Sequence, residues 1–438
     1  MNLYMRYNQR PHTISSYFMQ KKNRWLIAMS AVGIHISIGS VYSWSVFSKP
    51  IMKEFGWNLA EVSGIFSVAI MLLGLSAAFM GKWVEKRGPR VAATVSAIFF
   101  ASGLIGAGAA TRIGSLPLLY LTYGVIGGMG LGIGYISPVS TLVKWFPDRR
   151  GLATGLAIMG FGFASLIASP IIANLIPSIG IANTFTMLGV VYLAIMIFSA
   201  SYLTLPPKDW AEKHKAKITK NTAPEIIPLT ANEAIKTRKF YYLWLMLFIN
   251  ITCGIAIISV ASPMAQEIAG LTTVSAATMV GIMGLFNGAG RIGWATLSDK
   301  IGRPNTYIAF FVIQIFAFAM LPQAKNPITF QMLVLLILTC YGGGFASIPA
   351  YISDMFGTKQ LAAIHGYILT AWAAAGIVGP MIVSYVRSTT NAYDKTLYIF
   401  VGFFVIALIT SILAKIEMKQ EHVKRFWWDK RELAANTN

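Results

Sequence analysis

Charged side chains are scarce in this sequence. Of its 438 residues only 12% are charged and 55% are hydrophobic, whereas about 25% of a typical soluble domain is charged. Length alone would suggest two or three soluble domains. Apolar stretches of about 20 residues, enough to cross a bilayer, recur instead along the whole chain. The sequence therefore predicts an all-α polytopic membrane protein.

Acidic residues are scarcer still, since 16 Asp and Glu stand against 36 Lys and Arg, a net charge of +20. Such an excess can serve nucleic-acid binding, but its distribution argues against that partner. With twelve spans and a cytoplasmic N-terminus, 29 basic residues fall in cytoplasmic segments, six in external loops, and one, Arg291, inside a span. This bias follows the positive-inside rule. We expect a protein of the cell (inner) membrane, surrounded by lipid, with both termini cytoplasmic and no nucleic-acid partner.

Cysteine is nearly absent, and the two that occur, Cys253 and Cys340, fall within apolar stretches. This excludes a disulfide framework and a cysteine metal cluster. The sequence also lacks a phosphate-binding loop, a His-x-x-x-His pair and the Gly-x-Ser-x-Gly motif of hydrolases. We therefore expect no enzyme activity and no cofactor or metal. No small-residue cleavage site follows the first apolar stretch, which indicates a retained helix.

The apolar stretches divide into two sets of six. The predicted spans are 25–47, 60–83, 90–110, 116–143, 150–173, 181–204, 240–262, 275–298, 304–322, 328–352, 361–386 and 396–415. The single long interruption is rich in Pro and Lys, which is typical of a solvated linker with at most one surface helix. The predicted organisation is a tail 1–24, a bundle 25–204, a central cytoplasmic loop 205–239, a bundle 240–415 and a tail 416–438.

An internal repeat supports this division. Glu85-Lys86-Arg87-Gly88 follows span 2, and Asp299-Lys300-Ile301-Gly302 follows span 8, at an offset of 214 residues. Repeats between halves are typical of secondary transporters. These loops resemble the motif between spans 2 and 3 of the major facilitator superfamily. In that superfamily such loop charges latch the ends of the two halves, so the resemblance assigns a gating role to Glu85, Lys86, Arg87, Arg90, Asp299, Lys300 and Arg303. The positive-inside rule alone is the simpler explanation for these charges, and a gating role is compatible with it.

Two further stretches narrow the resemblance. Lys144-Trp145-Phe146-Pro147-Asp148-Arg149-Arg150-Gly151 joins spans 4 and 5, and Phe286-Asn287-Gly288-Ala289-Gly290-Arg291 lies in span 8. They are similar to the oxalate:formate antiporter family and its monocarboxylate-transporter relatives. The resemblance covers the whole chain. It implies two pseudo-symmetric six-helix bundles that rock about one central anion site, in a chain that we expect to act as a monomer. Antiport and proton symport both stay open, because the Gly-Pro motif of antiporters is degenerate in span 5.

Arg291 is the strongest candidate for that site. All sixteen acidic residues fall in tails, loops or span ends, so no carboxylate in a span core can pair with it. An intramembrane cation is costly and is a functional hypothesis by default, and a guanidinium matches a carboxylate bidentately. The alternative is an Arg that braces helices through backbone carbonyls. Asn287 lies one turn earlier and would orient the guanidinium, contact substrate or join two helices.

Span 11 departs from the resembled family. Its oxalate-exchanging members carry a Lys there as a second cation, and the matching position here is Trp372, with no Lys or Arg between 361 and 386. One cation matches one carboxylate. We therefore expect a monocarboxylate such as lactate, pyruvate or formate. An oxalate exchanger, or a carboxylate sensor with a carrier fold that signals through its loop or tail, is the alternative.

Other candidates line the expected cavity. His35 lies about 15 Å into span 1 by helix rise, where it would be a buried structural His, a substrate contact or the one protein group able to carry a proton. The resemblance implies an aromatic wall around the substrate, although helix packing is the commoner role for such rings. Its expected members are Tyr42, Tyr135, Tyr341 and Phe345.

Overall fold

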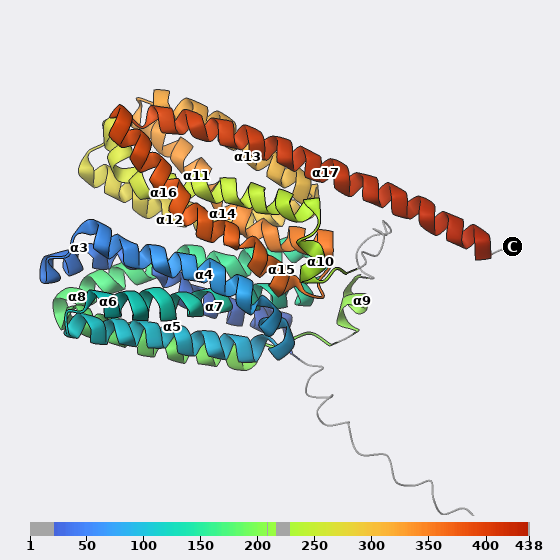
Figure 1. The fold of residues 1–438 in the computed structure, drawn as a ribbon, viewed down its shortest axis with the longest axis horizontal. Coiled ribbons are helices and arrows are strands. Elements are labelled where there is room, and N and C mark those ends of the chain that lie inside the picture. Colours follow the sequence, from blue (N-terminus) through green and yellow to red (C-terminus); the bar gives the residue numbers. More distant parts are fainter. Residues whose placement is uncertain (1–21, 208, 216–227, 437–438) are drawn as a thin grey trace, which may run out of the picture.

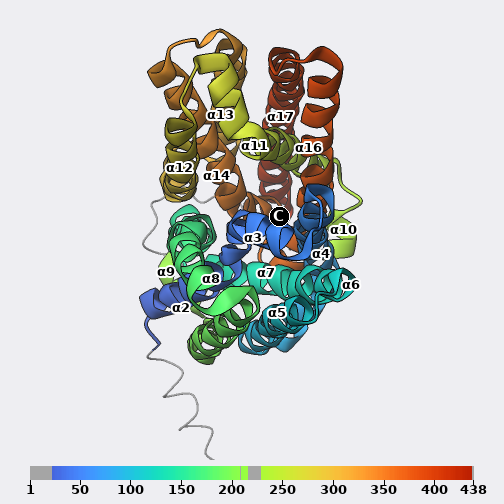
Figure 2. The ribbon, with the colours of Figure 1, turned by 90° about the vertical axis from the view of Figure 1, so that its left-hand side faces the viewer.

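The computed structural model describes residues 22–436, apart from 208 and 216–227. Two helical bundles lie side by side (Figures 1 and 2). The N-terminal bundle contains α2 (Arg24–Gly39), η1 (Ser40–Ser43), α3 (Trp44–Phe55), α4 (Leu59–Arg87), α5 (Pro89–Arg112), α6 (Leu116–Leu119), the π-helix η2 (Tyr120–Gly127), α7 (Gly128–Trp145) and α8 (Arg150–Tyr202). The C-terminal bundle contains α11 (Arg238–Ala269), α12 (Thr273–Ile301), α13 (Arg303–Met320), η3 (Leu321–Gln323), α14 (Pro327–Phe356), α15 (Leu361–Ile368), α16 (Thr370–Thr390) and α17 (Asp394–Asn436).

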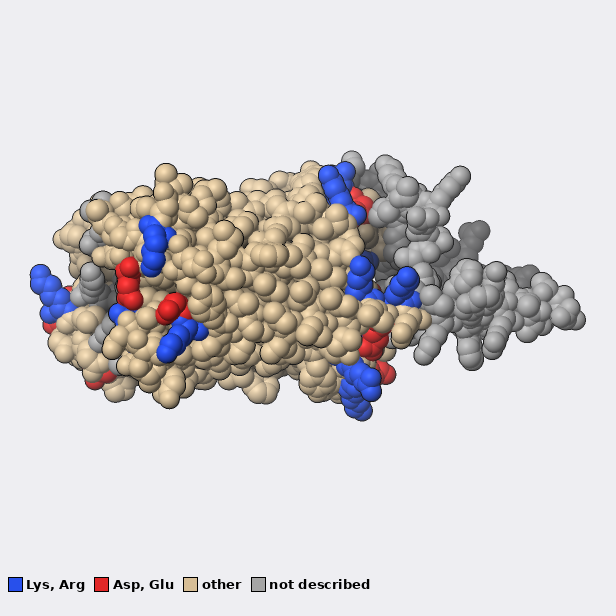
Figure 3. Space-filling model, turned by 90° about the horizontal axis from the view of Figure 1, so that it is seen from above, with Lys and Arg blue, Asp and Glu red and all other residues tan. Residues whose placement is uncertain are grey.

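Most of these helices are built to lie in lipid. Among the described residues, eleven helices are long and apolar enough to cross a membrane. Figure 3 shows charged side chains gathered toward the two ends of the molecule, with a broad uncharged band between them on the face in view. The predicted all-helical membrane fold is therefore confirmed.

The twelfth predicted span is α12, which is not among those eleven. Its 29 residues reach about 43 Å at 1.5 Å per residue, so its length suffices to cross a bilayer. Asn287 at its midpoint and Arg291 one turn later are both buried. The helix that carries the candidate site thus holds two buried polar side chains within its span.

Several spans are not the single helices that the sequence predicts. Span 1 is broken by η1, where Gly39 packs against the backbone of Phe161, and it runs on to Phe55. Span 4 contains the π-helix, and span 11 breaks at Leu369 between α15 and α16. Spans 5 and 6 are two helices within α8 that meet at Gly180, where the backbone is not helical and φ is 81°. These breaks arise from packing, which hydropathy does not report.

The central loop contacts both bundles. Its helix α9 (Trp210–Lys215) is held on the N-terminal bundle, where Trp210 Nε1 donates to the Trp145 carbonyl oxygen at 2.8 Å. Its helix α10 (Ala231–Ala234) is held on the other bundle, because the Ala231 N–H donates to Gln360 Oε1 at 2.8 Å. We call the end of the molecule that carries α9 and α10 the linker end (Figure 1). The expected tail after 415 continues α17 as a helix to Asn436 beyond this end, and of the tail 1–24 the structure describes only residues from 22 on.

Candidate functional site

Arg291 lies fully buried between the two bundles. Its Nε donates to Asn287 Oδ1 at 3.3 Å, and its Nη1 donates to the carbonyl oxygen of Ile158, on α8, at 3.3 Å. Its Nη2 has no hydrogen-bond partner among the described residues. No carboxylate of the described chain pairs with Arg291. One edge of the guanidinium is therefore hydrogen-bonded to the protein, while Nη2 makes no such bond within the described chain.

Glycines allow the two bundles to meet at this level. A Cβ added at Gly162 of α8 would lie 2.9 Å from the Cα of Gly288 on α12, and one added at Gly155 would lie 2.7 Å from the carbonyl oxygen of Arg291. Small residues of this kind let helix backbones approach closely in membranes. The seam between α8 and α12 thus brings backbone from one bundle against the guanidinium of the other.

Aromatic rings surround Arg291 and form what we call the cage. Its guanidinium carbon lies 5.2 Å from the ring centroid of Phe345 and 5.9 Å from that of Phe161, within the range of a cation–π contact. Trp372 bridges the bundles, since its ring centroid is 4.6 Å from that of Phe345, 5.7 Å from Phe161 and 5.4 Å from Tyr135. The cage consists of His35, Tyr42, Tyr135, Phe161, Tyr341, Phe345 and Trp372, all of them expected from the sequence except Phe161.

Several polar atoms of the cage lack partners. Among the described residues, the hydroxyls of Tyr42 and Tyr135 and Nε1 of Trp372 are buried without a hydrogen bond, as is Nη2 of Arg291. Arg291 interacts electrostatically with both tyrosines. Buried donors without acceptors are costly. These four groups belong to one cluster of aromatic rings around Arg291, and the oxygen atoms of a small anion can accept hydrogen bonds from them.

His35 differs from these residues because both its nitrogens have neighbours. Nδ1 is 2.8 Å from the carbonyl oxygen of Ala157, and Nε2 is 3.2 Å from that of Tyr135. A neutral imidazole carries one N–H and can donate to one carbonyl oxygen at a time. The ring stacks on Tyr135 with centroids 5.2 Å apart. His35 is thus fixed between α7 and α8 at the back of the cage.

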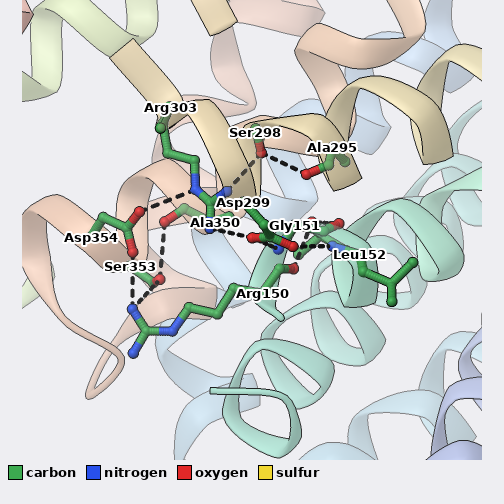
Figure 4. Close-up of polar contacts among 12 residues, drawn as sticks. Arg150, Gly151, Leu152, Ala295, Ser298, Asp299, Arg303, Ala350, Ser353 and Asp354 are labelled. Atoms are coloured by element: carbon green, nitrogen blue, oxygen red, sulfur yellow. Dashed lines mark hydrogen bonds and ion pairs between the residues drawn. The ribbon is translucent and has the colours of Figure 1, made fainter. Parts of the chain in front are cut away.

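Charged residues join the bundles at the linker end (Figure 4). The carboxylate of Asp299, on α12, accepts from the backbone N–H groups of Gly151 at 2.8 Å and Leu152 at 2.9 Å, at the start of α8. Arg303 pairs with Asp299 at 2.6 Å and with Asp354 at 3.1 Å. Arg150 of the other bundle donates to Asp354 at 2.9 Å. This network closes the seam between α8 and α12.

The first copy of the repeat motif makes a similar contact. Glu85, at the end of α4, accepts from the backbone N–H of Ala362 at 2.7 Å, at the start of α15, and pairs with Lys144 at 2.7 Å. Glycines again bring the helices together, since a Cβ at Gly81 would lie 2.5 Å from the Cα of Ala363. The remaining expected gating residues make no ion pair with another described residue: Lys86, Arg87, Arg90 and Lys300.

Sequence reasoning missed two residues of this region. Phe161 is one of 26 phenylalanines, and nothing in its local sequence marks it. His365, on α15, is fully buried, and its ring centroid lies 5.8 Å from that of Tyr135. The signal for His365 was present, because it is an ionisable residue within a predicted span. The prediction that His35 is the one protein group able to carry a proton is therefore incomplete, because His365 is a second buried imidazole.

Comparisons with known proteins agree on the family. A family model described as Major Facilitator Superfamily matches residues 27–380. The uncharacterized MFS-type transporter YhjX of Escherichia coli (strain K12) is 28% identical over 358 residues, 82% of this chain and 87% of that protein. The oxalate:formate antiporter of Oxalobacter formigenes is 29% identical over 398 residues, 90% of each chain. Monocarboxylate transporter 13 of Rattus norvegicus is 24% identical over 393 residues, 87% of this chain and 86% of that protein.

The fold is also known from solved structures. The transporter FucP, in an outward conformation, superposes with a TM-score of 0.70 at 13% identity, covering 88% of this chain and 98% of that chain. Identity at this level shows a shared fold only. Because the family model spans most of the sequence, the chain belongs to the major facilitator superfamily and is a multi-pass membrane transporter, not an enzyme.

Proposed function

We propose that this protein carries small monocarboxylate anions across the membrane by alternating access, with the cage as its binding site. The observation that carries the proposal is Arg291, whose Nη2 has no partner among the described residues. An unpaired cation inside a membrane protein favours an anionic ligand. A carboxylate presents two oxygens to this guanidinium, and the donors of Tyr42, Tyr135 and Trp372 can bind the remaining lone pairs.

The number of cations favours one carboxylate over two. Arg291 is the single Lys or Arg buried at mid-span in the described chain. The family resemblance described above places Trp372 at the position of the second cation, a Lys, of oxalate-exchanging members. An oxalate exchanger remains the second candidate, because the oxalate:formate antiporter is among the relatives at 29% identity. A second carboxylate in this cage would be desolvated against aromatic rings without a partner, which is costly.

We infer that the linker end faces the cytoplasm, because 29 of 36 basic residues belong to segments at that side. Asp299 and Glu85, with Arg303, act as the latch of this end, and the conformation described has it closed. Opening requires the seam between α8 and α12 and the seam between α4 and α15 to separate. Four contacts between the bundles must then break: the hydrogen bonds from the N–H groups of Gly151, Leu152 and Ala362 to the two carboxylates, and the ion pair of Arg150 with Asp354. The bound anion then leaves through the opened linker end.

Counterflow in proteoliposomes tests the proposal. Labelled lactate would be exchanged against unlabelled pyruvate, formate, acetate, oxalate or succinate. We expect monocarboxylates to compete best and R291Q to lower exchange by about 30-fold or more, since truncating one side of a buried charge pair costs about 2–5 kcal/mol.

R387Q is the matched control, because Arg387 pairs with Glu267 at 2.8 Å on an exposed part of the C-terminal bundle. It should exchange lactate like the wild type. Stronger competition by oxalate than by any monocarboxylate would assign the second candidate. Wild-type binding without exchange would instead favour a sensor.

A further inference from the structure

We propose that His365 is the site at which this carrier binds a co-transported proton. The inference rests on the proposed function and extends it from carriage of an anion to symport with a proton. The imidazole of His365 is fully buried, and both its nitrogens lack hydrogen-bond partners among the described residues. A neutral imidazole always has one nitrogen with a free lone pair. That nitrogen can accept a proton without breaking any protein contact.

The position of His365 places it between the latch and the cage. It lies four residues into α15, about 6 Å from the start of that helix by helix rise. Glu85 holds the start of α15 through the Ala362 N–H, and the next residue after His365, Gly366, packs against the backbone of Ala77 on α4. On its other side lies the ring of Tyr135, which belongs to the cage. Separation of α4 from α15 would therefore open the linker end and expose His365 to water.

No carboxylate of the described chain bonds to the imidazole of His365. The helices packed against α15 carry ionisable groups near the linker end. Lys82 interacts with Asn232, Glu85 with Lys144, Asp354 with Arg150 and Arg303, and Glu233 with Thr230, while Lys239 has interactions of its own. Lys86 and Arg87, exposed at the end of α4, make no ion pair with another described residue. On α16 the charged residue is Arg387, at the opposite end. The titratable groups that face His365 are Tyr135, and His35 through its charge when protonated.

This arrangement couples a proton to an anion. A protonated His365 sealed behind α4 would be a buried cation without a partner, in the same interior as Arg291, and such a state is strongly disfavoured. With a carboxylate on Arg291, the added negative charge offsets the proton. The linker end can then close around an empty, deprotonated carrier or around a carrier that holds both anion and proton. One proton and one monocarboxylate cross together, and no net charge is moved by the pair.

His35 is less suited to this role. Its nitrogens each face a backbone carbonyl oxygen, at 2.8 and 3.2 Å, and it lies within the cage. A proton on His35 would be held in place by two acceptors. A coupling group must instead release its proton when the opposite side opens, which suits a residue whose partners change as the seam opens.

Transport under a proton gradient tests the inference. Proteoliposomes with an inward gradient of one pH unit would take up labelled lactate, with protein-free vesicles subtracted for passive diffusion. The wild type should accumulate lactate up to about tenfold, the limit for one proton per anion at 1.36 kcal/mol per pH unit. H365Q should exchange lactate in counterflow like the wild type but show no accumulation. H214Q is the matched control, since His214 lies on α9 outside the bundles.

Two results overturn the inference while leaving the proposed function intact: wild-type counterflow without gradient-driven accumulation, or H365Q that accumulates lactate like the wild type. Loss of all wild-type counterflow would instead refute the proposed function. In that case a second measurement, made without substrate, tests whether a proton on His365 opens the linker end. Spin labels at R87C and K300C, at the linker ends of the two bundles, should report a linker end that opens as the pH falls from 8 to 5. A wild-type distance that does not change with pH would contradict the inference, whether or not H365Q folds.

Discussion

The two seams of the linker end, between α8 and α12 and between α4 and α15, are held by the same kind of contact, but one seam has more contacts than the other. In each, the carboxylate of the repeat motif accepts from the first N–H groups of a helix in the other bundle, where free donors and the helix dipole favour a negative charge. Asp299 accepts hydrogen bonds from two N–H groups and belongs to an ion-pair network with Arg303, Arg150 and Asp354. Glu85 accepts a hydrogen bond from one N–H group and forms an ion pair with Lys144 alone. The repeat thus gives the two halves the same contact without the same stability. The weaker seam, between α4 and α15, is the one that covers His365.

The largest effect is expected when the weaker seam, between α4 and α15, is pushed apart. G81A places a methyl group 2.5 Å from the Cα of Ala363, where only backbone can move. Overpacking of this kind costs about 1–3 kcal/mol, so we expect the linker-end-open population to rise by about 5- to 150-fold. The distance between spin labels at R87C and K300C measures it. G293A on α12 is the control, because a Cβ there meets no atom within 4 Å, and an equal effect from G293A would refute the packing argument.

Removing the charge of Asp299 should have the next largest effect. D299N can keep one oxygen acceptor but loses the charge that two N–H groups and Arg303 share. Hydrogen bonds to charged groups contribute about 1.5–3 kcal/mol, so we expect a shift of about 2 kcal/mol toward the open linker end, about 30-fold. The same spin-label distance reports it. An effect smaller than that of E85Q would reverse the order of the two seams.

E85Q should act in the same direction but less. Its side chain gives up one charge-assisted N–H bond and one ion pair with Lys144, and a partly exposed ion pair adds about 1 kcal/mol or less. We expect about a fivefold gain in the open population. In the double variant D299N/E85Q the two free energies should add, because the seams share no residue. Additivity is the result expected if both seams open in one step, and a clear departure from it would show that they open separately or are coupled to each other.

Much of the fold was predictable because lipid imposes simple rules. The spans follow from runs of apolar residues, the repeat from the spacing of Glu85 and Asp299, and the family from the stretch that ends at Arg291. The breaks at η1 and at Leu369 were not predictable. They depend on where another helix crosses. At η1, for example, Gly39 of α2 packs against the backbone of Phe161 on α8, and hydropathy contains no such information.

The candidate site also contains residues that the sequence marks and residues that only the packing of the helices reveals. Arg291 and Asn287 stand out because polar residues inside a span are rare, so their chemistry alone marks them. Phe161 cannot be told from the other phenylalanines until α8 is packed beside α12. The same holds for the division of labour between His35 and His365, since it depends on which nitrogens meet carbonyl oxygens and which meet none.

The low apolarity of α12 also bears on how the protein is made. An Arg at mid-span lowers the tendency of a segment to leave the translocon for lipid by about 2.5–3.5 kcal/mol, and α12 is not among the eleven candidate spans of the described chain. We therefore expect α12 to insert together with a neighbour, with α11 before it and α13 after it as the adjacent partners in the chain. The biogenesis of the carrier is then cooperative at this point. Substitutions on α11 or α13 far from any ligand would reduce the amount of inserted protein while leaving the transport rate per molecule unchanged.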